Sequence, residues 1–389
     1  MKVAQVTLRF DAPGGVETNV REVATRLQSL GADVTVYASD LFDEASWDRR
    51  TGYRPAVDGV PVRRFPVYRR LVPGLTLPLF TGLVGALADD APDVIHAHSH
   101  RYGHVLQAAL VARARRIPLV VSTHYHPADP GETAVKRGLL RGQDQLFGAT
   151  AYRVARAIVV ETEREARLVR EFAPADRLRV IPPGIDLDAW RAPAPPPPGG
   201  LPDGFVLYAG RLAPNKGLGT LVEAIALLPA AERPTLLLMG PDWGERARLV
   251  ALAHRLGVDG YLRLTGPVDD PATYRAIFRS ARLFVLPSFW EAFGLVLLEA
   301  MAARVPIVAT AVGGVPEVLE EGRAGALVPP GDAGALAAAI ARLLADADAA
   351  RSLVTAGAAR VDGLTWAKAA ERHLALYREV AGGAAAPSA

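Results

Sequence analysis

The chain has 389 residues, 50% of them hydrophobic, and its 44 Lys and Arg against 41 Asp and Glu give a net charge of +3. This length and apolar content suit two domains of ordinary size. The absence of cysteine excludes disulfides and thiolate metal sites. The sequence also lacks a basic stripe interleaved with aromatic residues, the pattern that would indicate a nucleic-acid partner. No apolar run is long enough to predict a spanning helix, and the first ten residues read as a strand rather than a signal region, which favours a cytoplasmic protein.

The start of the chain reads as a strand, a helix and a second strand. Residues 3–8 are an apolar strand-like run, a helical pattern covers residues 16–30, and residues 34–37 predict the next strand. Gly14 and Gly15 lie in the first turn, where glycine lets the backbone approach a ligand closely. A plain tight turn is the alternative. The turn is not G-x-G-x-x-G, so the fingerprint of a nicotinamide dehydrogenase is missing.

Histidines follow two of the next predicted strands. His96 and His98 end one strand, and because side chains alternate along a strand they share one face. The sequence pattern indicates no third metal ligand beside these two histidines, so we expect a binding or structural role and no metal site. His124 follows the strand over residues 119–123. Ligands of open α/β sheets bind beyond the carboxyl ends of the strands, so His124 is a candidate for hydrogen bonding to a phosphate or sugar hydroxyl, with a strand cap as the alternative.

A proline-rich connector, APAPPPPGG at residues 192–200, marks the boundary between the two predicted domains, because such a segment is stiff and extended. Strand and helix patterns alternate on both sides of it. We therefore expect an N-terminal domain over 1–190, a linker over 191–202, a C-terminal domain over 203–363, a last helix over 364–380 and a tail over 381–389.

Two cations lie on the first strand-to-helix loop of the second domain. Arg211 and Lys216 follow the predicted strand over residues 205–209. Arginine offers a planar fork of donors and lysine a point charge, a combination that can clamp a diphosphate. A solvated loop is the alternative for these residues taken alone.

Two glutamates accompany a later strand of the same domain. The apolar run at residues 283–286 predicts a buried strand, and Gly294 opens a helical segment that carries Glu299 among apolar residues. A carboxylate in such surroundings needs a partner or a shifted pKa, and sugar hydroxyls can donate to it. Glu291 precedes the helix, with seven residues between the two glutamates. The first helical turn also favours a phosphate. Two solvent-facing carboxylates are the alternative.

The stretch from Glu291 to Glu299, with Phe293 and Gly294 inside it and GGVPE at residues 313–317 after it, resembles the Glu-x7-Glu motif of the glycosyltransferase group 1 family. Members are retaining enzymes of the GT-B fold. The resemblance implies an α/β protein with two Rossmann-like domains whose parallel sheets face each other across an interdomain cleft. It also implies that the second domain binds a nucleotide sugar, that the first binds the acceptor, and that the last helix crosses back to the first domain.

The resemblance further implies a role for each candidate residue. Glu291 and His124 would be catalytic, with Glu291 holding the hydroxyls of the transferred hexose. Glu299 would bind the ribose, and Arg211 and Lys216 the diphosphate. The donor-binding set is Gly14, Gly15, Arg211, Lys216, Val268, Phe293, Gly294, Leu295 and Glu299. No cofactor or metal is implied beyond the nucleotide sugar, with UDP or GDP as the nucleotide.

Two other functions share this architecture: a nucleotide-sugar 2-epimerase, and a non-catalytic subunit that binds a sugar nucleotide. For the transferase, the expected acceptor is a glycolipid, a lipid-linked precursor or a polysaccharide. Residues 63–80 contain Arg63, Arg64, Arg69 and Arg70, no acidic residue and several large apolar side chains. This composition is typical of a segment that binds anionic lipid headgroups, and we expect it to contact the inner face of the membrane. A solvated face with internally packed leucines is the alternative.

Overall fold

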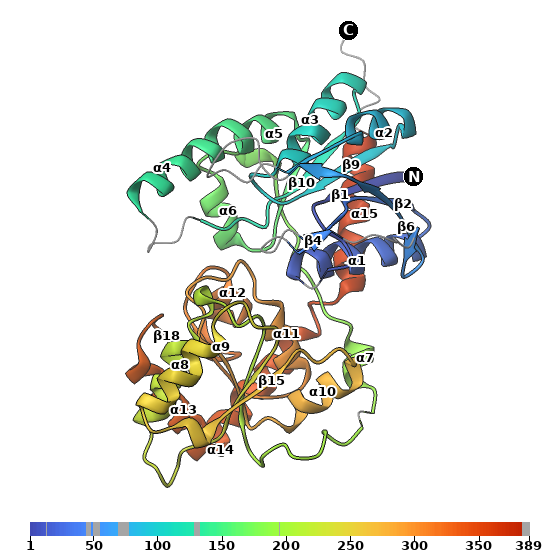
Figure 1. Ribbon diagram of the computed structural model, residues 1–389. Helices are drawn as coiled ribbons and strands as arrows, with labels where there is room; N and C mark the ends of the chain where they lie inside the picture. The colour runs from blue at the N-terminus through green and yellow to red at the C-terminus, as the bar shows by residue number, and fades with distance from the viewer. Residues whose placement is uncertain are drawn as a thin grey trace. The chain divides into compact units, whose positions relative to one another are not determined.

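The computed structural model describes residues 1–12, 14–43, 48–49, 55–68, 78–127, 133–193 and 195–382. It forms two compact units, one of Met1–Pro183 with Trp366–Ala389 and the other of Gly184–Thr365 (Figure 1). The chain enters the second unit ahead of the boundary expected at residue 190, because Trp190 packs into the hydrophobic core of that unit.

The described part of the first unit contains an eight-stranded sheet in the order β12-β11-β10-β9-β1-β2-β6-β5. All neighbours pair in parallel except β5 at the edge, which runs antiparallel to β6. Its strands are β1 Lys2–Thr7, β2 Asp33–Ser39, β5 Ala56–Val57, β6 Val60–Phe65, β9 Val94–His98, β10 Leu119–Ser122, β11 Ala157–Val160 and β12 Leu178–Val180. Two short antiparallel strand pairs accompany it, β3 Leu41–Asp43 with β4 Asp48–Arg49, and β7 Val67–Tyr68 with β8 Leu79–Phe80.

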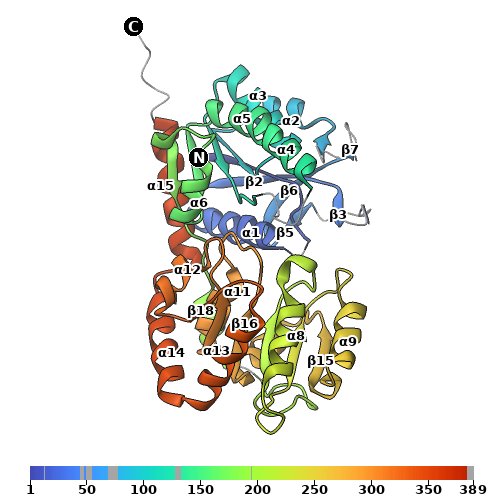
Figure 2. The same ribbon diagram turned by 90° about the vertical axis from the view of Figure 1, so that its left-hand side faces the viewer.

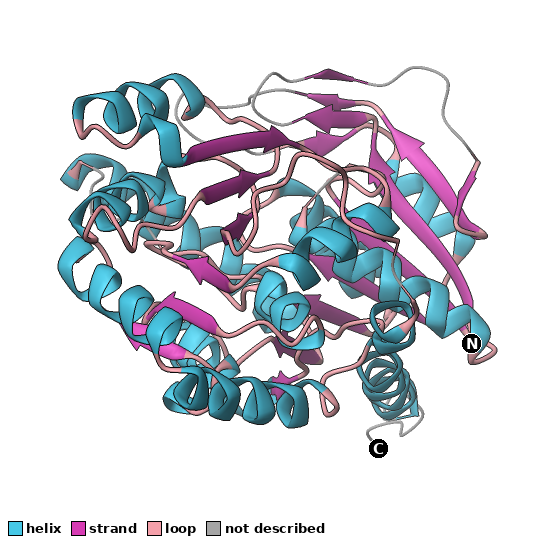
Figure 3. Cartoon of the chain, turned by 90° about the horizontal axis from the view of Figure 1, so that it is seen from below, coloured by secondary structure: helices cyan, strands magenta, loops and turns pink. Residues whose placement is uncertain are grey.

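Helices flank the strands (Figure 3), as a parallel sheet with buried faces requires. In the first unit these are α1 Gly15–Ser29, α2 Leu83–Asp90, α3 Gly103–Arg115, α4 Ala134–Gln143, the π-helical η1 Asp144–Gly148, α5 Ala149–Val154, α6 Glu163–Val169, the short η2 Ala175–Arg177 and α15 Trp366–Gly382. The last helix, α15, packs against α1 and β9 (Figure 2). It therefore contributes to the core of a unit whose other elements lie more than 180 residues earlier in the chain.

The second unit contains a six-stranded parallel sheet in the order β15-β14-β13-β16-β17-β18. Its strands are β13 Val206–Ala209, β14 Leu236–Met239, β15 Leu262–Gly266, β16 Leu283–Leu286, β17 Ile307–Thr310 and β18 Ala326–Val328. Its helices are α7 Leu187–Arg191, η3 Pro214–Lys216, α8 Leu218–Leu227, α9 Arg246–Arg255, η4 Asp259–Tyr261, α10 Pro271–Ser280, α11 Leu295–Ala302, α12 Val315–Val318, η5 Glu320–Gly322, α13 Ala333–Ala345 and α14 Ala347–Val361. Numbered within the unit, the strand order is 3-2-1-4-5-6, that of a Rossmann sheet.

Each unit therefore has a point where the strand order reverses. In the second unit β13 pairs with both β14 and β16, and in the first unit β1 pairs with both β2 and β9. In open α/β sheets, the loops on either side of such a point turn to opposite faces, and ligands bind at the carboxyl edge between them. The two parallel sheets predicted from the sequence are confirmed, and their crevices are where ligands are expected.

The start of α6 has one half of a capping box. Thr162 caps the helix, because its Oγ1 accepts from the Glu165 backbone N–H at 3.0 Å. The reciprocal bond of a capping box does not form, since Glu165 Oε2 accepts from the Glu161 N–H at 2.7 Å, one residue earlier. Glu165 Oε1 also accepts from the Tyr125 N–H at 2.7 Å. Glu165 thus ties the start of α6 to the loop after β10.

The basic segment over residues 63–80 is only partly described, and Arg69 and Arg70 lie outside the described residues. Arg63 pairs with Asp90, and Arg64 pairs with Asp11 at 2.9 Å. Phe80 is buried in the core of the first unit and Leu79 is partly buried, whereas the leucines between residues 69 and 77 also lie outside the described residues. No helix within the described ranges is long and apolar enough to cross a membrane.

Candidate functional site

The reversal point of the second unit brings two predicted residues into direct contact. Lys216 lies in η3, on the loop after β13, and Glu291 lies on the loop after β16. Lys216 Nζ donates to Glu291 Oε1 at 2.6 Å, and Ser288 Oγ donates to the same oxygen at 2.7 Å. The two charged side chains are only 14% and 13% exposed. A largely buried ion pair in this geometry keeps both groups oriented at the edge of the sheet.

Backbone contacts that only glycine permits hold these loops together. Gly217 has a φ of +64°, and a Cβ there would lie 2.0 Å from the Pro287 carbonyl oxygen. Gly313, on the loop after β17, has a φ of +49°, and its Cβ would lie 1.8 Å from the Glu291 carbonyl oxygen. The same oxygen accepts from the Gly314 N–H at 3.0 Å. The loops after β13, β16 and β17 therefore form one packed edge.

Arg211 is oriented by a residue that sequence reasoning missed. Its guanidinium carbon lies 4.4 Å from the centre of the Trp243 ring, a cation–π contact. The backbone N–H of Trp243 donates to the Leu212 carbonyl at 2.9 Å, and Tyr208 Oη donates to the Arg211 carbonyl at 2.8 Å. Arg211 is thus fixed at both its backbone and its side chain. A tryptophan in a Pro-Asp-Trp-Gly turn carries no local signal that would link it to an arginine 32 residues earlier.

Glu299 has the protein partner that its apolar surroundings require. Tyr274 of α10 donates from its hydroxyl to Glu299 Oε2 at 2.7 Å. Burial raises the pKa of Glu299 to about 7, and the hydrogen bond from Tyr274 only partly opposes this effect. Glu299 therefore changes its charge near neutral pH. The tyrosine went unnoticed in the sequence because aromatic residues on a helix usually indicate core packing.

The other predicted donor-binding residues of this unit lie around the same loops. Gly294 has a φ of +84° and caps α11, and Leu295 is the first residue of that helix. The Phe293 side chain is buried in the core, with 3% exposed. Val268 is half-buried against the same core, after β15. The side chains of Phe293 and Val268 therefore have structural contacts, whatever their backbone groups bind.

In the first unit, Gly14 and Gly15 lie at the corresponding reversal point, after β1. Gly14 caps α1, and Gly15 is the first residue of that helix. A Cβ at Gly14 would lie 2.0 Å from Glu17 Oε2, and Glu17 Oε1 pairs with Arg9 at 2.7 Å. Both of these charged residues are buried. The glycine therefore leaves room for an internal ion pair at the start of α1.

His124 follows β10 in the left-handed region, with a φ of +42°. Its Nδ1 lies 3.0 Å from Glu161 Oε1, and its Nε2 lies 3.4 Å from His98 Nδ1. Burial lowers the pKa of His124, but the hydrogen bond and charge of Glu161, aided by Glu165 and Glu17, outweigh burial and raise the pKa overall. His124 is thus a buried histidine in contact with a carboxylate and a second histidine.

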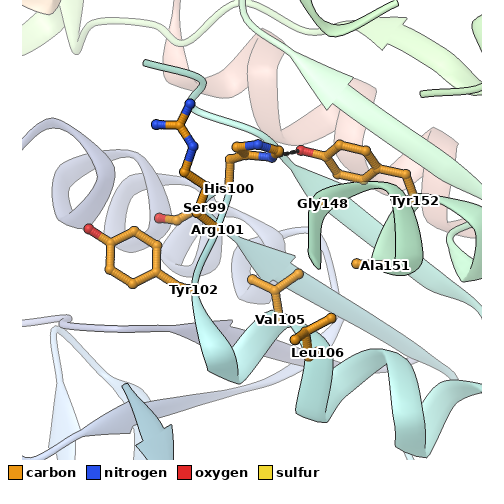
Figure 4. A pocket seen from close by; sticks show the side chains of 9 residues that line it. All are labelled: Ser99, His100, Arg101, Tyr102, Val105, Leu106, Gly148, Ala151 and Tyr152. Atoms are coloured by element: carbon orange, nitrogen blue, oxygen red, sulfur yellow. Dashed lines mark hydrogen bonds between the residues drawn. The ribbon is translucent and has the colours of Figure 1, made fainter. Parts of the chain in front are cut away.

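A small pocket beside this loop contains residues that the sequence did not single out. Figure 4 shows the hydrogen bond between the His100 ring and the Tyr152 hydroxyl, with the Arg101 side chain nearby. His100 Nδ1 and the Tyr152 oxygen are 2.6 Å apart. His100 Nε2 and Arg101 both contact Asp144, at 2.7 Å for the histidine and 2.8 Å for Arg101 Nη2. Gly148 lies directly above the His100 ring, because a Cβ there would be 2.3 Å from its Cε1. One side of the pocket therefore consists of hydrogen-bonded polar groups, and Val105, Leu106 and Ala151 add apolar side chains to its lining.

Comparison with known proteins supplies the family. The family model described as glycosyl transferases group 1 matches residues 199–360, and the model described as Glycosyltransferase Family 4 matches residues 13–189. A D-inositol 3-phosphate glycosyltransferase 1 of Catenulispora acidiphila is 34% identical, over 96% of this chain and 93% of that protein. The D-inositol 3-phosphate glycosyltransferase of Streptomyces bingchenggensis is 31% identical, over 94% and 85%.

Solved structures agree along the whole chain. Sucrose-phosphate synthase from Thermosynechococcus elongatus matches with a TM-score of 0.75 and 25% identity, over 98% of this chain and 99% of that one. Anabaena HepE, solved in complex with UDP, matches with a TM-score of 0.77 and 21% identity, over 97% and 100%. The two parallel-sheet α/β units thus have the GT-B fold, and the chain belongs to the group 1 glycosyltransferases.

Proposed function

We propose that this protein transfers a hexose from a nucleoside-diphosphate sugar to a hydroxyl acceptor with retention of anomeric configuration. The observation that carries the proposal is the Lys216–Glu291 pair at the reversal point of the second sheet, with Arg211 on the same loop as Lys216. The two cations suit a diphosphate, and the carboxylate suits sugar hydroxyls. UDP in the HepE complex supports a uridine or similar nucleotide.

In this proposal the bond between the sugar C1 and the phosphate oxygen breaks while the acceptor oxygen bonds to C1 on the same face. The acceptor proton passes to the leaving phosphate oxygen, so the protein supplies neither a nucleophile nor a base. Arg211 and Lys216 stabilise the negative charge that grows on the diphosphate. Glu291 holds the hexose hydroxyls, and Glu299 accepts from the ribose. Preorganisation by Trp243 and Ser288 keeps these groups oriented before the donor arrives.

For the acceptor we propose a phosphorylated polyol or sugar. Two relatives of this chain are named D-inositol 3-phosphate glycosyltransferases, and one similar solved structure is that of a sucrose-phosphate synthase. A glycolipid or other lipid-linked acceptor is the second candidate, and membrane association belongs with it. It is less favoured because Arg63 and Arg64 are neutralised by Asp90 and Asp11.

The test incubates the protein with UDP- and GDP-hexoses and a panel of acceptors: inositol phosphates, hexose 6-phosphates and a lipid-linked sugar in vesicles. Mass spectrometry identifies a hexosylated product, and proton NMR gives its anomeric configuration. An inverted product contradicts retention. Donor epimerisation without any acceptor indicates the 2-epimerase instead, and nucleotide-sugar binding without turnover on any acceptor indicates a non-catalytic subunit.

A further inference from the structure

A continuous chain of buried hydrogen bonds links His124 to the C-terminal helix. Gln5 of β1 is its centre: Gln5 Nε2 donates to the Tyr377 hydroxyl of α15 at 2.9 Å, and Gln5 Oε1 lies 2.6 Å from His98 Nε2. Gln5, His98 and Tyr377 are at most 1% exposed. Water therefore cannot replace any of these partners, and each contact needs one donor and one acceptor.

On the Tyr377 side of this hydrogen-bond chain, each group's role as donor or acceptor follows from that of its neighbour. The Tyr377 hydroxyl accepts from Gln5, so its own proton goes to His96 Nδ1, 2.6 Å away. His96 then carries its proton on Nε2 and donates to Ser122 Oγ at 2.8 Å. Burial, together with His373 and His124, keeps the pKa of His96 well below its usual value, so the ring is neutral with a single proton.

On the His98 side, the donor and acceptor roles from Gln5 to His124 are determined in the same way. Because Gln5 Oε1 can only accept, His98 Nε2 must donate to it. Burial and the neighbouring histidines hold the pKa of His98 well below its usual value, so His98 is neutral and its Nδ1 has a lone pair. His124 Nε2 faces that lone pair at 3.4 Å and must donate. His124 Nδ1 faces the Glu161 carboxylate at 3.0 Å and must donate as well.

We propose that Gln5, acting through His98, is a positioning residue that holds His124 as a doubly protonated imidazolium, so that the first unit has a fixed cation and not a general base at the carboxyl edge of its sheet, after β10. The charged groups around His124 agree. Glu161 follows β11, Glu165 lies in α6 and Glu17 in α1, and all three favour the cation. Burial opposes the cation, whereas the lowered pKa values of His96 and His98 in β9 and of His373 in α15 keep these neighbouring rings neutral, so that they place no positive charge beside it.

A cation there suits a phosphate group of the donor or acceptor, an assignment that rests on the proposed function. It also agrees with a mechanism in which the leaving phosphate, and no protein base, accepts the acceptor proton. The orientation of the Gln5 amide decides the outcome. If the amide were reversed, its NH2 group would donate to His98 Nε2, His98 Nδ1 would donate to His124, and His124 would lose one proton.

Nitrogen-15 NMR of the full-length protein with ring-labelled histidine tests the inference without any turnover. The His124 signals are identified by their absence in His124→Asn. In the wild type near neutral pH we expect both His124 nitrogens to be protonated and to titrate with a midpoint above about 6.5, the usual value for histidine. A singly protonated His124 with a midpoint at or below that value overturns the proposal.

Two variants test the role of Gln5. Gln5→Leu removes the acceptor of His98, and we expect the His124 midpoint to fall by about one pH unit or more. Tyr377→Phe breaks the other side of the chain while leaving the contact between Gln5 Oε1 and His98, and it should leave the His124 midpoint unchanged. Equal midpoints in Gln5→Leu and the wild type overturn the role of Gln5.

If Gln5→Leu does not fold, Gln5→Glu replaces it, because a carboxylate still accepts from His98 and should retain the imidazolium. A fall of the His124 midpoint in Gln5→Glu then overturns the role of Gln5. The failure of this inference and that of the proposed function remain distinguishable: the NMR spectrum reports the charge of His124 whether or not hexose is transferred, and the acceptor panel reports transfer whatever that charge is.

Discussion

One oxygen of Glu291 accepts from both Lys216 and Ser288, so the charge of the lysine is balanced before any donor binds. A diphosphate that enters this site meets a lysine whose position is already set. Arg211 has no such carboxylate contact among the ion pairs of the described residues, and its orientation comes from the face of Trp243. The two cations are therefore held by different physical means, one electrostatic and one by stacking.

Removing the cations should slow the reaction. Lys216→Ala or Arg211→Ala is expected to lower kcat/KM by about 2–4 kcal/mol in activation free energy, the scale of one preorganised electrostatic contact. Steady-state kinetics with the best donor measures the effect. Arg255→Ala, an exposed cation on α9 of the same unit, is the matched control. Wild-type turnover in the Lys216→Ala, Arg211→Ala double variant contradicts the assignment.

The two glutamates should separate binding from chemistry. Glu291→Gln is expected to lower kcat with little effect on the affinity for the free nucleoside diphosphate, because Glu291 is assigned to the hexose. Isothermal titration with UDP or GDP measures the affinity, and single-turnover kinetics measures the chemical step. Loss of diphosphate binding in Glu291→Gln alone would mean that its role and that of Glu299 are exchanged.

Glu299 should make both stability and nucleotide affinity depend on pH. Its pKa rises from 4.5 to about 7 in the folded protein, so the folded state binds this proton more tightly than the unfolded state does. The free energy of unfolding is therefore highest below the unfolded pKa and falls as pH rises through about 7. At about pH 8, the free energy of unfolding measured by chemical denaturation should be roughly 1–3 kcal/mol higher for Glu299→Gln than for the wild type. Near pH 4 the two should not differ.

The same variant should lose affinity for the nucleotide, because an amide oxygen accepts less strongly than a carboxylate from ribose hydroxyls. In the wild type this affinity should increase as pH rises through about 7, where Glu299 becomes ionised. Titration of UDP across this range, in parallel with Glu299→Gln, checks both statements. A pH dependence that persists unchanged in the variant would show that another group controls binding.

At the scale of elements, the site is built from loops whose backbones touch. Gly217 begins α8 from the left-handed region and lies against Pro287, so the loop after β13 can approach the loop after β16. Gly313 makes the same approach to Glu291 from the loop after β17. The helices that follow these strands could form with other residues at these positions, but the packed edge that presents Lys216 and Glu291 could not.

A matched pair of glycine substitutions isolates this close approach. Gly217→Ala and Gly257→Ala replace glycines with φ of +64° and +68°, so both carry the left-handed cost of about 1–2 kcal/mol. Only Gly217→Ala also collides with a backbone oxygen, since nothing lies within 4 Å of a Cβ at Gly257. We expect the collision to add roughly 1–3 kcal/mol to the loss of unfolding free energy. Equal losses in chemical denaturation would show that the loops can separate freely.

On the scale of the whole molecule, each unit has its own hydrophobic core, and the chain passes between the units twice. The return passage delivers α15 to the first unit, where Tyr377 bonds to Gln5 and His96. The first unit therefore depends on residues from both ends of the chain. The second unit is one continuous segment.

Calorimetry of the full-length protein should resolve these dependences. Tyr377→Phe is expected to lower the Tm of the first unit, because it removes a buried hydrogen bond that contributes about 1–2 kcal/mol. Tyr208→Phe should lower the Tm of the second unit for the same reason. Saturating UDP should raise only the transition of the second unit, because a ligand stabilises the unit that binds it. A UDP-dependent rise confined to the transition lowered by Tyr377→Phe would contradict the placement of the nucleotide site.

Local patterns were sufficient for much of this protein. Alternating strand and helix patterns predicted an α/β chain with two domains, and the resemblance to the group 1 family implied a parallel sheet in each and roles for Gly14, Lys216 and Glu291. Val206–Ala209 and Leu283–Leu286 formed as expected, since buried parallel strands are continuous apolar runs. These features depend on neighbours within a few residues, which a sequence displays directly.

Only the tertiary structure decided which side chains meet. Glu299 and Tyr274 are 25 residues apart in the chain, Lys216 and Glu291 are 75 apart, and Gln5 and Tyr377 are 372 apart. Their contacts follow from strand order and helix packing, and no local period encodes either. The pKa of Glu299 depends in turn on its burial and on its contact with Tyr274. The sequence therefore determined the elements and the candidate groups, and the fold determined their partners and hence their charge.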